Sequence, residues 1–198
     1  MATIITEERL TVAEFLTKYG HCSGVELVRG RVVWAGHSPA ALGLGGGFRV
    51  PEFKHGVICS RVAKAISDFV DTHQLGWTAI NDTFVTVNET DGSVRGADVL
   101  FVSYGRLPQG PIPDRLSVAP ELVVEVRSPT DRWGELFAKV GEYLAAGVAV
   151  VVVVDPNTET VSVYRDATGQ QILTTTDDLT IPDVLPGFTL SIARLFGP

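Results

Sequence analysis

The sequence predicts a mixed α/β or α+β fold in which one central sheet is flanked by helices. The predicted elements run in the order helix, strands, helix, strands, which is typical of such folds. Residues 148–154 form an almost unbroken run of valine, as in a strand buried on both faces. Residues 54–73 place their apolar side chains at helical spacing, as in a helix that packs on a sheet. We expect a single domain over residues 1–198.

The N-terminal part predicts a short helix and then a hairpin. Thr11 and Glu14 have the spacing of a capping box that opens a helix, and Gly20 is suited to end it. Val25–Val28 and Arg31–Trp34 are two β-prone runs separated by two residues that include a glycine. This pattern is typical of a β-hairpin.

A long loop precedes the main amphipathic helix. Residues 35–51 contain many glycines and two prolines, so we expect a flexible loop there. Long loops of this kind are often functional or disordered. The helix predicted over residues 54–73 has one apolar stripe and carries its charged residues elsewhere.

Four short strands are expected after Gly76, with a proline-rich loop through Pro120 before the last of them. They are Trp77–Ile80, Phe84–Val87, Ala97–Val102 and Leu122–Val126. A second helix is expected over residues 131–146, followed by the valine-rich strand. The remaining elements are a hairpin, formed by 161–164 and 171–174, and a short turn or helix over 191–196.

Composition excludes several classes of protein. The 16 Lys and Arg against 23 Asp and Glu give a net charge of −7, which argues against non-specific coating of nucleic acid. No apolar run reaches the roughly 20 residues of a membrane helix, and the first twenty residues do not resemble a secretory signal. We therefore expect a cytoplasmic protein with no membrane span. The two cysteines lack CxxC spacing, so we expect reduced thiols.

Two acidic residues occur in strands that are otherwise apolar. Strand alternation puts Asp98 on a face with Leu100 and Val102. The same rule puts Glu125 on a face with Glu121, Val123 and Arg127. A carboxylate removed from water needs compensation, so two of them in adjacent core strands suggest a shared divalent ion.

The second helix supplies a cation beside these acids. Lys139 lies at the edge of the predicted buried stripe, next to Leu136 and Tyr143, so it can lean toward the sheet. Two acids that bind Mg²⁺, with a lysine that orients or deprotonates a metal-bound water, make a site that hydrolyses phosphodiester bonds.

These residues resemble the Uma-two family of restriction-endonuclease-like proteins within the PD-(D/E)XK nuclease superfamily. The similarity covers most of the chain, and its motifs are specific in their order rather than singly. They are Glu26–Val33, His55, Ala97–Val99, Glu125–Pro129, Lys139 with Tyr143, Gly147-Val148 and Val154–Pro156.

The resemblance implies a restriction-endonuclease-like fold and a Mg²⁺-dependent endonuclease, with Mn²⁺ as a substitute ion. It implies that Asp98 and Glu125 bind the metal and that Glu26 is the accessory acid. It also implies that Lys139, on the helix, takes the role that the superfamily's lysine has on the strand. A nucleic-acid substrate, with DNA expected, and a homodimer follow from the same resemblance.

The chain departs from the family's pattern at two positions. Ala97 replaces a proline that many members have, which should alter only backbone stiffness. Arg127 occupies the place of the superfamily's strand lysine, but an arginine cannot act as a base. We therefore retain Arg127 in the candidate catalytic group and assign the lysine role to Lys139.

Each candidate also has a structural interpretation. Asp98 and Glu125 could be core acids paired with Arg95 or Arg127, and Lys139 could pair with Glu135 one helical turn away. Glu26 could be an exposed hairpin charge.

Three further residues have open assignments. His55, a candidate for substrate binding, could simply lie at a helix end. Asp131 is expected to cap or open its helix. Glu121 could be solvated or reach a metal through water.

The function hypothesis is a Mg²⁺-dependent nuclease that cuts DNA. The alternative is a catalytically silent nuclease-fold module that binds nucleic acid or a protein partner, which the net charge of −7 favours somewhat. A purely structural acidic domain is a third interpretation, and we rank it last. The target sequence, strandedness and biological pathway are not readable from the sequence.

Overall fold

A computed structural model of the chain describes residues 3–4, 9–22, 24–34, 53–128, 131–166 and 169–197. The predicted loop over residues 35–51 lies outside these ranges, so its flexibility stays a prediction.

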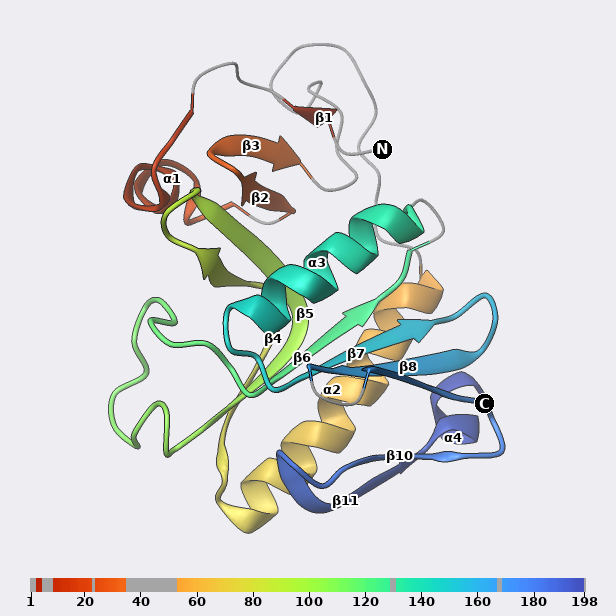
Figure 1. The fold of residues 1–198 in the computed structure, drawn as a ribbon. Coiled ribbons are helices and arrows are strands. Elements are labelled where there is room, and N and C mark those ends of the chain that lie inside the picture. The colour runs from red at the N-terminus through yellow and green to blue at the C-terminus, as the bar shows by residue number, and fades with distance from the viewer. Residues whose placement is uncertain are drawn as a thin grey trace.

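The described residues form four helices and eleven strands (Figure 1). The helices are α1 (Val12–Tyr19), α2 (Phe53–His73), α3 (Trp133–Ala145) and α4 (Ile192–Phe196). The strands are β1 (Thr3–Ile4), β2 (Val25–Val28), β3 (Arg31–Trp34), β4 (Gly76–Asn88), β5 (Ser93–Ser103), β6 (Leu122–Val126), β7 (Val150–Asp155), β8 (Thr160–Arg165), β9 (Gly169–Leu173), β10 (Asp178–Ile181) and β11 (Leu185–Ser191).

Nine of these strands form one mixed sheet, in the order β1-β3-β2-β5-β6-β7-β8-β9, with β4 paired to β5. Only β6 and β7 pair in parallel among the described strands, and α3 connects them. The other pairings are antiparallel, and β10 with β11 forms a separate two-stranded sheet. The predicted fold class, a central sheet flanked by helices, is confirmed.

The sheet divides along one edge of β5. β4 pairs with β5 over nearly its whole length. The opposite edge of β5 pairs with β2 at Val94 and with β6 from Val99 to Phe101. Residues 95–98 of β5 therefore lie in a fork between β2 and β6, where backbone groups need partners other than a strand.

Helices cover both faces of the sheet (Figure 1). α2 packs on one face with α4 and the β10–β11 hairpin, through Ile58, Val62, Ile66 and Val70. α3 packs on the other face through Leu136, Val140 and Tyr143. The alternation of β6 separates these two cores, because Leu122, Val124 and Val126 join the α2 side while Val123 joins the α3 side.

Most predicted elements form within a residue or two of their expected bounds. The Thr11–Glu14 capping box opens α1, and the β2–β3 hairpin has the predicted ends. All six residues of β7 are buried, as a strand between β6 and β8 should be. The short C-terminal element is a helix.

The structure differs from the prediction at β4, which is one strand rather than two. Asn81 and Asp82, which separate the predicted strands, form a β-bulge opposite Asp98, since Ile80 pairs with Val99 and Thr83 with Ala97. Both bulge residues have positive φ, a conformation that Asn and Asp tolerate better than most residues. The polar pair therefore bends the strand without ending it.

Strands β1, β10 and β11 were not predicted. β11 contains Pro186 and Gly187 and lacks a clear alternation, so its sequence resembles a loop. None of the helices in the described ranges is long and apolar enough to cross a membrane.

Candidate active site

The candidate site occupies the fork of the sheet at Gly96. In an antiparallel strand the N–H and C=O of one residue point to the same edge. Gly96 N–H donates to Glu26 Oε1 at 3.2 Å, and its carbonyl accepts from Lys139 Nζ and Tyr143 Oη, each at 3.2 Å. Backbone groups that would otherwise join a ladder are therefore bonded by side chains from β2 and α3.

Lys139 links two carboxylates on different strands. Its Nζ lies 2.9 Å from Glu26 Oε1 and 3.0 Å from Glu125 Oε2. Burial lowers the pKa of Lys139, but Glu125 and Glu26 raise it by more, so the pKa lies well above its usual range. Lys139 is an ammonium group between two acids, and not the partner of Glu135 that one helical turn would allow.

Glu125 is the most unusual acid in this group. It projects from β6 toward α3, as alternation predicts, and Tyr143 Oη donates to its Oε1 at 2.8 Å. Burial raises the pKa of Glu125 to about 7; Lys139 lowers this pKa, whereas Asp98 and Glu26 raise it further. The carboxyl is therefore held in surroundings that do not fully compensate its charge.

Glu26 is buried, contrary to the exposed hairpin charge considered above. Arg95 Nη1 donates to Glu26 Oε2 at 2.8 Å, and the same guanidinium binds Glu142 through Nε at 2.6 Å and Nη2 at 3.0 Å. Burial raises the pKa of Glu26, but Lys139 and Arg95 lower it by more, so the net shift is downward. Glu26 is an anion that fixes Lys139 from the β2 side.

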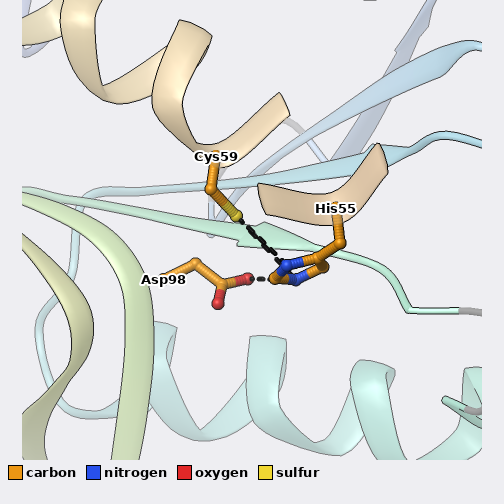
Figure 2. A group of neighbouring side chains, drawn as sticks. All are labelled: His55, Cys59 and Asp98. Carbon is orange, nitrogen blue, oxygen red and sulfur yellow. Dashed lines mark hydrogen bonds and ion pairs between the residues drawn. The ribbon is translucent and has the colours of Figure 1, made fainter. Parts of the chain in front are cut away.

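Asp98 lies opposite the bulge of β4 and turns toward α2 (Figure 2). Its Oδ2 accepts from the backbone N–H of Val126 at 2.7 Å and lies 3.6 Å from His55 Nε2. Hydrogen bonds to Asp98 and Cys59 raise the pKa of His55 to about 11, against the opposing effect of burial.

The prediction that Asp98 shares a face with Leu100 is wrong. Ala97 and Leu100 pack in the same α3-side core although they are three residues apart, so alternation breaks between them. The bulge at Asn81 and Asp82 supplies the physical reason, because a bulge changes the direction of the side chains beside it.

Asp82 is a neighbouring acid that the sequence analysis did not single out. Burial is the main cause that raises the pKa of Asp82, and the nearby charge of Asp98 raises it further. The signal that could have found it is the polar Asn81-Asp82 pair inside a β-prone run. Arg95, considered above as a partner of Asp98 or Glu125, instead binds Glu26 and Glu142. Glu142 was missed, since it meets Arg95 only in the tertiary structure.

Of the six predicted site residues, the fork brings five into one neighbourhood, and Arg127 lies elsewhere. Glu26, Glu125 and Lys139 are in direct contact, while Asp98 and His55 form a pair on the α2 side. Arg127 Nη1 instead lies 3.1 Å from Asp155 Oδ2, and its guanidinium lies over the Trp133 ring at 4.7 Å. Its geometry is that of a structural ion pair.

Two further interpretations are corrected. Asp131 accepts from the backbone N–H of Ser128 at 2.8 Å, and the N-cap of α3 is Arg132, so Asp131 closes a turn rather than capping the helix. Glu121 is neither solvated nor near the fork, because its carboxylate binds Ser103 and Arg106.

The donor set fits a hard divalent cation. Asp98 and Glu125 each lie next to the Val99–Val124 pair of the β5–β6 register. Asp98 turns toward α2 and Glu125 toward α3, but the charge of Asp98 still raises the pKa of Glu125, so the two carboxylates are close enough to interact. Oxygen ligands of this kind are those that Mg²⁺ and Mn²⁺ prefer. A second group of potential ligands, His55, Cys59 and Asp98, lies within 4.8 Å on the α2 side.

Comparisons with known proteins agree with this architecture. The model of the Uma2 family, described as "Putative restriction endonuclease", matches residues 48–193. A solved structure of "a putative nuclease belonging to DUF820" from Anabaena variabilis ATCC 29413 aligns with a TM-score of 0.78 and 20% sequence identity. The alignment covers 94% of this chain and 97% of that chain, and at this identity it establishes the fold. No curated protein matches.

Proposed function

The chain belongs to the Uma2 family of restriction-endonuclease-like proteins, and we propose that it is a Mg²⁺-dependent endonuclease that hydrolyses DNA phosphodiester bonds. The observation that carries the proposal is Glu125, a buried carboxyl with its pKa raised to about 7 beside Asp98 and Lys139. The chain's own residues compensate the negative charge of this buried carboxylate only in part, and a divalent cation would compensate the rest.

In this proposal Asp98 and Glu125 bind Mg²⁺, with Mn²⁺ as a substitute. When bound, the ion neutralises phosphate charge and lowers the pKa of a water molecule. Val126 N–H and Tyr143 Oη orient the two carboxylates through hydrogen bonds at 2.7 and 2.8 Å. Removing such orienting groups typically lowers metal affinity or activity 10- to 100-fold.

Lys139 positions the attacking water in this proposal. Its ammonium has three N–H donors, and Glu26, Glu125 and the Gly96 carbonyl accept all three. If Glu125 binds a metal, the Lys139 N–H that donates to it would become available for a water or a phosphate oxygen. Lys139 is therefore a donor in the reaction rather than a proton acceptor, and Glu26 is the positioning residue that holds it.

His55 and the aromatic residues near the start of α3 would contact the substrate. Hydrogen bonds to Asp98 and Cys59 raise the pKa of His55 to about 11, and a protonated imidazole there would suit a phosphate. Trp133 and Phe137 stack at 5.4 Å between centroids while 39% and 47% exposed. Exposed aromatic rings are surfaces on which nucleobases stack.

A catalytically silent module that binds nucleic acid or protein is the second candidate. The net charge of −7 favours it, and so does the full occupation of the three Lys139 donors. The two candidates differ in metal chemistry, because only the enzyme requires a divalent ion at Asp98 and Glu125.

The experiment measures nicking of supercoiled plasmid and of single-stranded DNA with Mg²⁺ or Mn²⁺. Wild type is compared with Glu125→Ala and Lys139→Ala, and Lys64→Ala on the exposed face of α2 is the matched control. We expect metal-dependent cleavage that both site variants lose and the control retains, with folded protein by circular dichroism throughout. DNA binding without cleavage in every protein would favour the silent module.

We also propose that the protein forms a homodimer and that it acts in the cytoplasm. A dimer would bring two active sites to the two strands of a DNA duplex, and the family resemblance supports it. Two free cysteines suit a reducing compartment. Light scattering during size exclusion tests the dimer, and a monomer at all concentrations would contradict it.

A further inference from the structure

A second group of metal-ligating side chains lies on the α2 side of the fork, on the far side of Asp98 from Lys139. His55 and Cys59 are four residues apart on α2, so they project from one face of the helix. Figure 2 shows the His55 imidazole in contact with both Cys59 and Asp98, the latter on β5. All three are partly buried, and one donor atom from each lies within 4.8 Å of the others.

The distances suit a tetrahedral ion. His55 Nε2 lies 3.6 Å from Asp98 Oδ2 and 3.8 Å from Cys59 Sγ. Around zinc, bonds of about 2.0 to 2.1 Å to nitrogen and oxygen and about 2.3 Å to sulfur separate tetrahedral ligands by roughly 3.3 to 3.6 Å. The two distances to His55 exceed these separations by a few tenths of an ångström at most, and the Cys59 and Asp98 donor atoms lie within 4.8 Å of each other. An ion that draws the three side chains together would have three ligands and a fourth position open.

The chemistry of these donors differs from that of the Mg²⁺ pair. Thiolate and imidazole are softer ligands than carboxylates and select Zn²⁺ and related transition ions over Mg²⁺. Cys59 has no part in the proposed nuclease reaction, and its sulfur contacts the same imidazole that faces Asp98.

We propose that His55, Cys59 and Asp98 form a second metal site, which takes Zn²⁺ or a similar ion and draws Asp98 away from the Mg²⁺ pair. The consequence for Mg²⁺ rests on the proposed function, because it assumes that Asp98 serves both ions. Val126 N–H donates to Asp98 Oδ2, the same oxygen that faces His55, so that oxygen has one acceptor position left for a metal. Zn²⁺ is then an inhibitor rather than a cofactor.

Cobalt titration of the purified, metal-free full chain tests the site without DNA. A Co²⁺ ion bound to thiolate gives a charge-transfer band in the near ultraviolet, and stoichiometric Zn²⁺ should abolish it. Cys59→Ser should lose the band and weaken Zn²⁺ binding at least tenfold. Cys22→Ser, which changes the chain's other cysteine, should keep both, as a matched control.

His55→Gln provides a second variant in case Cys59→Ser does not fold. It should retain the thiolate yet weaken Co²⁺ and Zn²⁺ binding at least tenfold. Absence of the band in wild type, its persistence in Cys59→Ser, or its loss in Cys22→Ser would overturn the site. Equal Zn²⁺ affinity in all proteins would do the same.

Mn²⁺ titration by calorimetry, with and without one equivalent of Zn²⁺, tests the competition. We expect Zn²⁺ to weaken Mn²⁺ binding at least tenfold in wild type and much less in Cys59→Ser. Equal Mn²⁺ affinity with and without Zn²⁺ would overturn the competition while the cobalt band still supports the site. No Mn²⁺ binding to the metal-free chain would instead contradict the proposed function.

Discussion

Two glutamates, Glu121 directly before β6 and Glu125 near its other end, lie in different surroundings. At the start, Glu121 accepts from Ser103 N at 2.9 Å and Ser103 Oγ at 2.5 Å, and Arg106 lies 3.2 Å away. At the other end, Glu125 has Lys139 and Tyr143 as partners, but Lys139 is shared with Glu26. Glu121 therefore has a backbone donor and a cation, Arg106, that it shares with no other carboxylate in these contacts. Glu125 shares its cation, Lys139, with Glu26.

This difference separates a structural acid from a candidate ligand. Arg106 also binds the carbonyls of Ala119, Pro120 and Gly147, so the Glu121 end is a closed hydrogen-bonded corner. Around Glu125, by contrast, burial and neighbouring acids keep the pKa at about 7 despite Lys139. Identity and strand position do not distinguish the two acids; the balance of charge around each one does.

The largest expected effect comes from exchanging each acid for its amide. Glu125→Gln should reduce nicking by at least about 100-fold, because it removes a charged metal ligand, while the metal-free protein stays as stable as wild type. Glu121→Gln should keep the activity and lose roughly 1 to 2 kcal/mol of unfolding free energy, because Arg106 loses its partner. Nicking rates and urea unfolding measure the two effects. The reverse pattern would refute the contrast between the two ends.

The pH dependence of metal binding sharpens the same contrast. The pKa of Glu125 is raised to about 7, so the protonated form dominates below that pH and must lose its proton to bind a metal. Mn²⁺ affinity should therefore fall about tenfold per pH unit below 7 and level off above it. Calorimetry at pH 6, 7 and 8 measures this. A flat profile in wild type would contradict it, and Glu125→Gln is the control that should lack the change of slope near pH 7.

Stability of the metal-free chain should show the opposite trend for this group. The pKa of Glu125 in the folded state lies above its ordinary value of 4.5. Glu125 therefore stabilises the folded chain fully below pH 4.5, and this contribution to the free energy of unfolding is lost as the pH rises through about 7. Glu125→Gln should remove that part of the pH dependence.

Removing the carboxylate that holds Lys139 from β2 should have an intermediate effect. Glu26→Gln should lower kcat about tenfold and leave Mn²⁺ affinity within about twofold, since Lys139 is displaced while the metal carboxylates remain. Glu142→Gln is the matched control, because it also removes a carboxylate from Arg95 but does not contact Lys139. Equal activity of the two variants would show that the Glu26 contact does not position Lys139.

The smallest effect on catalysis is expected at Arg127. Arg127→Ala should cost roughly 3 kcal/mol of stability, because it leaves Asp155 buried without its cation, and change nicking by less than about threefold. Arg165→Ala, which breaks the ion pair with the more exposed Asp183, should cost less than about 1 kcal/mol. A folded Arg127→Ala protein without activity would return Arg127 to the candidate catalytic group.

Local patterns were sufficient for most elements of the fold. The Thr11–Glu14 capping box, the β2–β3 hairpin and the valine-rich strand depend on interactions within a few residues, and each formed as predicted. The alternation of β6 correctly directed Glu125 toward α3. The hairpin of β10 and β11 escaped prediction because its pairing depends on packing against α2 and α4 rather than on its own pattern.

The sequence by itself determined which residue types were available for chemistry: acids within apolar strands, and a lysine at the edge of a helical stripe. Only the tertiary structure decided that β2 and β6 diverge from the same edge of β5, which brings Glu26 and Glu125 onto one ammonium group. It also turned Asp98 toward His55 and Arg127 toward Asp155. These side-chain contacts depend on strand pairing and on a bulge, both of which join residues far apart in the chain. Periodicity within one segment carries no information about them.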